Sequence, residues 1–195
     1  NYWPKPNQPG TREFRNNFYT SFAGPFPVWT HLARVDHAFS SNHRMYVRFM
    51  REGFWSISNK SFLSDYDGGK YNQDKRGFAF DDVYIFSPSF FVNFRYGLNH
   101  RWGIQNRLSR GFDLATLGFS PQFLALLPDK QNAVFPRVFA GPLTPLSRNG
   151  ADSRWSAIIN SFNLNFTKLR GEHSFRFGAD VRVYREFDRN YTLDV

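Results

Sequence analysis

The sequence lacks cysteine among its 195 residues, which excludes disulfides and thiolate metal sites. It also lacks an uncharged apolar run of the roughly 18 residues that a membrane helix needs, so a membrane crossing would have to use strands. Basic residues outnumber acidic ones by 25 to 16, but they are scattered singly between Lys5 and Arg189. Because nucleic-acid binding depends on clustered Lys and Arg, we expect no nucleic-acid partner.

Recognisable catalytic and metal-binding patterns are also missing. The five histidines show no ligand spacing of the H-x-x-x-H kind. Asp36–His37 and Asp81–Asp82 stand without a nucleophile elbow, a phosphate loop or a paired-carboxylate context. We therefore expect no enzyme activity, no catalytic residue, no metal site and no cofactor. The chain begins with no export signal, so for an exported protein we expect the true N-terminus to lie upstream.

Aromatic residues are abundant, with 24 Phe and 19% aromatics overall, although the mean hydropathy is only -0.53. Such a composition requires the apolar side chains to be segregated by position. Apolar and polar residues do alternate with the period of two that strands show. The alternation predicts six strands in three hairpins, at residues 31–39, 44–52, 77–86, 92–99, 158–167 and 174–186.

The connections between these strands alternate between short and long. Polar turns are predicted at residues 40–43, 87–89 and 170–173, and long loops at residues 53–76 and 103–152. Residues 1–28 read as an irregular, proline-rich segment. Within the second loop, Ser120–Pro121 can begin a short helix through Leu127 because Pro suits a first helical turn.

This asymmetry is typical of outer-membrane β-barrels, which have short periplasmic turns at one rim and long extracellular loops at the other. The expected fold is therefore all-β, a fragment of a large antiparallel transmembrane outer-membrane β-barrel. Six strands are too few to close, since such barrels begin at about eight strands. Open edges in lipid leave backbone groups without partners, so we expect neighbouring strands beyond both ends of the chain.

The alternation also assigns faces, because charge on the lipid side costs roughly 2–4 kcal/mol per Arg at the membrane centre. Arg185 shares the apolar face and should lie near the outer rim. The predicted lumen-facing residues are Arg34, Asp36, Arg48, Arg95, Arg176, Asp180 and Arg182. The predicted lipid-facing residues are Val35, Phe39, Val47, Phe49, Phe94, Leu98, Phe162, Leu164, Phe177 and Val181.

Several segments resemble, in the same order, the barrel of TonB-dependent receptors of the Oar-like type. The early hairpin is carried by Arg34-Val35-Asp36-His37-Ala38-Phe39-Ser40 and His43-Arg44-Met45-Tyr46-Val47-Arg48-Phe49. The other matching segments are Tyr2-Trp3-Pro4-Lys5-Pro6-Asn7, Phe86-Ser87-Pro88-Ser89 with Asn93-Phe94-Arg95-Tyr96-Gly97, Gly111-Phe112-Asp113-Leu114-Ala115-Thr116-Leu117-Gly118-Phe119, and Gly171-Glu172-His173-Ser174-Phe175-Arg176-Phe177-Gly178-Ala179-Asp180.

The resemblance implies that residues 1–195 are part of one TonB-dependent receptor barrel of about 22 strands with a plugged lumen. The plug and the carboxypeptidase-regulatory-like domain of such receptors are not in this sequence. The implied partners are outer-membrane lipid, the protein's own plug domain and TonB complex, and an unknown large substrate that is taken up or exported. The implied location is the outer membrane of a Gram-negative bacterium.

A soluble or secreted all-β module that binds glycans or peptides is the alternative. Its aromatic loops would supply Phe54, Trp55 and Trp102 as contacts. Alternation by itself fits both architectures. The two differ in where the apolar faces go: they meet in a shared core in a sandwich, and they point to one convex side in a barrel.

Overall fold

A computed structural model describes residues 2–13, 15–58, 60, 62–127, 133–138 and 152–191. The strands among these residues form one antiparallel sheet in which each strand pairs with the next along the chain. The all-β prediction is confirmed. The strands are β1 (Val28–Ser40), β2 (His43–Ser58), β3 (Gly69–Ser87), β4 (Phe90–Arg107), β5 (Asp152–Arg170) and β6 (His173–Tyr191).

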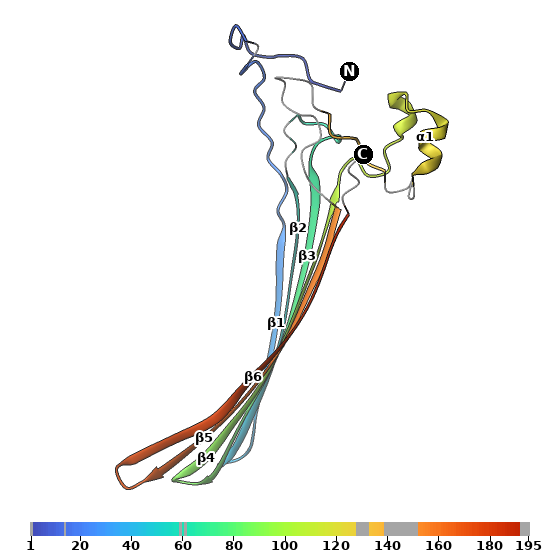
Figure 1. Cartoon of the computed structure of the whole chain (residues 1–195). Coiled ribbons are helices and arrows are strands. Elements are labelled where there is room, and N and C mark those ends of the chain that lie inside the picture. The colour runs from blue at the N-terminus through green and yellow to red at the C-terminus, as the bar shows by residue number, and fades with distance from the viewer. Residues whose placement is uncertain are drawn as a thin grey trace.

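Three tight turns lie together at one end of the sheet, here called the turn end (Figure 1). They join β1 to β2, β3 to β4 and β5 to β6, and two residues separate the strands in each case. Gly171 in the last turn has a φ of 58°, a left-handed conformation that glycine adopts without steric cost. All three turns lie where the sequence predicts them.

The strands extend further from the turns than the alternation indicates. β2 continues to Ser58 and β3 begins at Gly69, with Trp55 paired to Asn72. The predicted loop at residues 53–76 is therefore wrong, and the connection spans only residues 59–68. β4 likewise runs to Arg107, which moves the start of the second connection from residue 103 to residue 108. Residues 128–132 and 139–151 of that connection lie outside the described residues.

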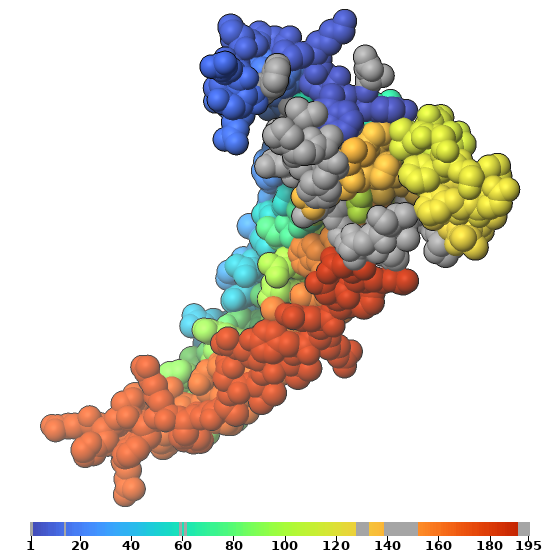
Figure 2. Space-filling model, turned by 45° about the horizontal axis from the view of Figure 1, so that its top comes forward, coloured from blue at the N-terminus to red at the C-terminus, as the bar shows by residue number. Residues whose placement is uncertain are grey.

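The opposite end of the sheet, here called the loop end, carries the N-terminal segment and the two short helices (Figures 1 and 2). The helices are η1 (Leu114–Leu117) and α1 (Pro121–Leu126). The Ser120 hydroxyl accepts a hydrogen bond from the Phe123 amide at 3.2 Å, which confirms the predicted helix start. No helix within the described ranges combines the length and apolarity needed to cross a membrane.

An aromatic cluster of Tyr2, Tyr66, Phe112 and Phe135 holds this end together. The Phe135 ring is 1% exposed and lies 4.9 Å from the Tyr2 ring and 5.1 Å from the Phe112 ring. The Phe135 amide also donates to the Ser109 hydroxyl at 3.2 Å. The cluster joins the start of the chain to both connections between hairpins.

The sheet itself has almost no core. Among the described residues, the buried apolar side chains are Leu114, Ala133, Phe135 and Ala157, and only Ala157 lies in a strand. No second sheet packs on the first within those ranges. Large apolar side chains such as Val35, Phe162 and Val181 are exposed instead. The described residues do not form the shared core expected of a soluble sandwich.

Candidate functional site

The register of the sheet gives each side chain a face, because directly paired residues of antiparallel strands point the same way. Val35 pairs with Val47, which pairs with Phe80, and the row continues through Tyr96 and Phe162 to Val181. We call the side on which this row lies the apolar face. It comprises the odd-numbered residues of β1, β2 and β6 and the even-numbered residues of β3, β4 and β5. The other side is the polar face.

Both predicted sets fall on single faces. The seven residues predicted to face the lumen share the polar face, because Arg34, Arg48 and Arg182 lie in one row and Asp36, Arg95 and Asp180 in the next. The ten residues predicted to face lipid share the apolar face, including Phe39, whose ring stacks on His43 at 4.6 Å. Which face meets lipid and which meets the lumen stays a prediction.

Charged pairs line the polar face around the middle of the strands. Arg34 donates to Asp36 at 2.6 Å, and Arg182 donates to Asp180 at 3.1 Å, in both cases two residues along the same strand. Asp81 accepts from Arg95 on the neighbouring strand at 2.5 Å. Asn93 donates to the same carboxylate at 3.0 Å. Asp81 was not among the predicted site residues. Successive residues of a strand point to opposite faces, so Asp81, which follows Phe80 of the apolar face, lies on the polar face.

A shallow hollow of about 450 Å³ opens on the polar face. Its floor consists of Ala79, Gly97 and Ser161, three small residues paired in register on β3, β4 and β5. Arg95 and Asp180 stand at its edge. A Cβ atom added at Gly97 would meet only the Ser161 Cβ, at 3.9 Å, so the hollow has room for a larger side chain.

Some cations of this face have no ion-pair partner among the described residues. Arg48 and Arg176 are exposed and make no ion pair or side-chain hydrogen bond with the part of the chain that the structure describes. Arg48 lies beside the hollow because it pairs with Ala79, whereas Arg176 lies on β6 four residues nearer the turns than Asp180. Both are available to an acidic group that approaches the polar face. The polar face can therefore bind charged or hydrogen-bonding groups, and it holds no recognisable catalytic constellation among the described residues.

Aromatic side chains form a belt across the apolar face at the turn end. Phe86 stacks on Phe90 at 5.1 Å, and Phe166 stacks on Phe177 at 5.2 Å. Phe90 in turn stacks on Phe166 at 6.2 Å, which joins the two pairs across β4 and β5. Tyr84 extends the belt toward β2, 4.8 Å from the Phe86 ring. We call this set the turn-end aromatic belt.

A second aromatic row crosses the same face toward the loop end. Trp29, Trp102 and Phe187 lie in one register row, here called the tryptophan row. On β4, ten residues separate Val92, which pairs with Tyr84 of the turn-end belt, from Trp102. At about 3.4 Å per residue and a tilt of about 40°, this is about 26 Å along the membrane normal. The two rows thus match the aromatic girdles that flank an apolar band of about 25 Å in outer-membrane barrels.

Comparison with known proteins agrees with this geometry. A model of the outer membrane β-barrel domain family matches residues 1–194. The chain belongs to this family. No curated protein and no solved structure matches the chain significantly. Membership supports a Gram-negative outer-membrane location, as the sequence predicts, and barrels of this kind are typically transport or structural proteins rather than enzymes.

Proposed function

We propose that this outer-membrane barrel chain is a segment of a TonB-dependent receptor, which moves a large substrate across the outer membrane with energy from the TonB complex. The ordered sequence resemblance to Oar-like receptors, from Tyr2 to Asp180, supports the receptor type. The observation that carries the proposal is the polar face, where the exposed Arg48, which has no ion-pair partner among the described residues, lies beside a hollow. Such a surface fits a lumen that receives a plug or a substrate.

The edges of the sheet support a barrel larger than six strands. β1 and β6 each pair on one side only within the described chain. In lipid each unsatisfied backbone group costs several kcal/mol, so both edges require further strands. A closed sheet with many strands has a wide lumen, as the plugged transporters of about 22 strands do.

Energy coupling and passage can be tested in the full-length parent protein. Uptake of a labelled panel of siderophores, oligosaccharides and peptides is measured in cells that contain or lack TonB. We expect one substrate to be taken up only when TonB is present. Uptake that is equal in both strains would contradict the proposal.

The hollow can be tested with Gly97. Gly97→Phe fills the hollow, and we expect it to lower uptake severalfold without preventing barrel assembly. Gly97→Ala adds only the one methyl group that the site accommodates and is the matched control. Heat-modifiable mobility on a gel reports whether each variant folds. Normal uptake by folded Gly97→Phe would exclude the hollow from the transport path.

A further inference from the structure

Most of the basic side chains on the apolar face of the described strands lie near its loop end. Arg51, Arg76 and Arg185 lie in one register row with His31 and His100. Arg154 and Arg189 are paired in a row four residues nearer the loops, and Lys70 lies beyond them on β3. We call these side chains the basic belt. The belt has six Lys and Arg residues, and the same part of the apolar face has two acidic residues, Asp74 and Asp152.

One carboxylate orients two guanidinium groups of this belt. Asp74, whose side chain is 7% exposed, accepts from Arg51 and from Arg76, each at 2.8 Å. The Arg51 and Arg76 side chains are 44% and 48% exposed, so both keep donors that face outward. Two guanidinium groups around one carboxylate leave one net positive charge. This arrangement presents N–H donors of the kind that bind phosphate oxygens in pairs.

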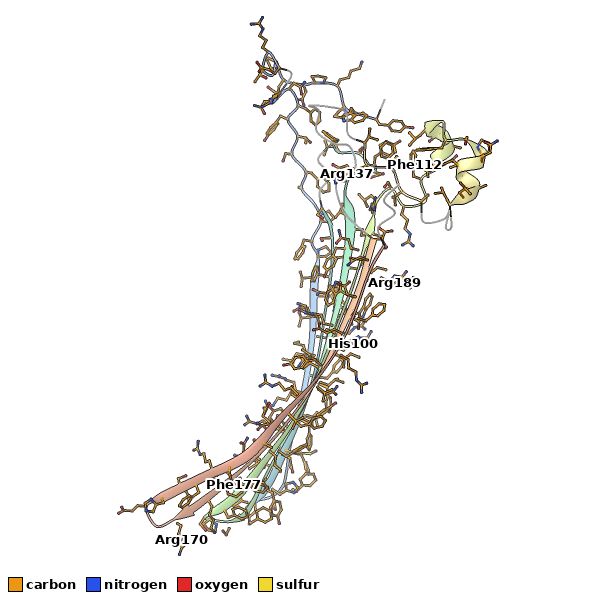
Figure 3. The ribbon with its side chains drawn as sticks, viewed as in Figure 1. His100, Phe112, Arg137, Arg170, Phe177 and Arg189 are labelled. Carbon is orange, nitrogen blue, oxygen red and sulfur yellow. The ribbon has the colours of Figure 1, made fainter. Side chains whose placement is uncertain are left out.

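The belt lies where a headgroup would meet it. Along the strands the row of Arg51 and Arg76 lies two residues from the tryptophan row on the membrane side, and the row of Arg154 lies two residues away on the loop side. Two residues are about 5 Å along the membrane normal. The basic side chains therefore bracket the tryptophan row, which marks the boundary between acyl chains and headgroups. Figure 3 shows His100 and Arg189 on the loop side of Phe177, which lies in the turn-end aromatic belt.

The two ends of the apolar face differ sharply in charge. Near the turns, the Lys, Arg, Asp and Glu side chains of this face in the described strands are Lys168, Arg170 and Asp82, and Asp82 is paired with His43 at 2.8 Å. A nonspecific attraction to anionic lipid would need no such asymmetry. The difference matches a membrane in which only the leaflet at the loop end carries densely phosphorylated lipid.

We propose that the basic belt binds the phosphate groups of a phosphorylated glycolipid in the outer leaflet of the outer membrane. The proposal rests on the assignment of the apolar face to lipid and of the loops to the outside. Arg51 and Arg76, held by Asp74, engage one phosphate, and the exposed Arg154 and Arg185 engage a second from β5 and β6. Lys70, 5.1 Å from the Trp55 ring, extends the positive surface toward the sugar headgroup.

Binding is measured on the purified full-length parent in detergent, with lipid A that carries both phosphates as the probe. Arg154→Gln with Arg185→Gln removes two exposed charges for which the structure shows no protein partner among the described residues. We expect affinity to fall about fivefold for each substitution and about 25-fold for both, because a basic side chain near an anionic lipid surface contributes about 1 kcal/mol. Lys168→Gln, on the same face at the turn end, is the matched control and should change affinity less than twofold.

Two further binding measurements test whether the protein recognises the phosphate groups of the lipid. Lipid A stripped of phosphate should bind the unaltered protein at least tenfold more weakly, and millimolar inorganic phosphate should compete only partially. Equal binding of both forms of lipid A, or an equal loss with Lys168→Gln, would overturn the proposal. The comparison of the two lipids uses unaltered protein, so it holds even if the double variant fails to fold. The binding assay does not require transport, so its result does not depend on the outcome of the uptake experiment.

Discussion

Arginine in place of Val181 tests which face of the sheet meets lipid. Val181 is 53% exposed and ends the row that contains Val35, Phe80 and Phe162. On β6 this row lies four residues from Phe177 of the turn-end belt and six from Phe187 of the tryptophan row. These separations are about 10 Å and 16 Å along the membrane normal, which places Val181 near the membrane centre. Val181→Arg should therefore destabilise the assembled barrel by about 2–4 kcal/mol.

The neighbouring residue supplies the control. Arg182 lies on the polar face, and its pair with Asp180 leaves both side chains about half exposed, at 57% and 46%. Arg182→Ala should leave assembly intact because an exposed ion pair contributes little to stability. Assembly of the full-length parent is measured by heat-modifiable mobility and by the urea concentration at which the barrel unfolds in lipid vesicles. Normal assembly of Val181→Arg together with failed assembly of Arg182→Ala would invert the faces and remove the basis of both proposals.

Two other predictions concern the loops and the open edges. Phe135→Ala removes the most buried ring of the loop-end cluster, so it should destabilise the loops on the order of 3 kcal/mol while the barrel still assembles. Faster amide hydrogen exchange at Gly111 and Phe112, which both donate to the Ala133 carbonyl, would show this, and unchanged exchange would contradict it. Residues 1–195 produced alone in water should aggregate, because exposed Phe and Val side chains and two unpaired strand edges invite association. A monodisperse, cooperatively melting monomer in light scattering and calorimetry would refute that expectation.

The sequence predicts best where one face of a strand is apolar. The pairing of Phe162 with Val181 and of Val35 with Val47 follows from alternation together with short polar turns. A shift of register by one residue would move every apolar side chain of a strand to the other face, so the pattern fixes the register strongly. The positions of the three turns, and the sets of residues that share each face of the sheet, could therefore be predicted from the sequence alone.

Features that depend on several strands at once could not be obtained in this way. The basic belt joins Arg51, Arg76 and Arg185, which are far apart in sequence and become neighbours only through the register. The hollow depends in the same way on Ala79, Gly97 and Ser161 lying side by side. The buried Phe135 contacts rings from three other segments, and no local pattern around it indicates this.

The part of β3 that the sequence predicts as a loop shows where the apolar band ends. Between Gly69 and Arg76 β3 carries Lys, Asn, Gln and Asp, yet its backbone pairs continuously with both β2 and β4. Apolar and polar residues alternate along a strand when one of its faces lies in an apolar environment. The alternation is lost where both faces meet water or headgroups. The alternation on β3 stops near Arg76, two residues on the membrane side of the tryptophan row. The failed loop prediction and the aromatic spacing thus locate the same boundary, from independent features of the chain.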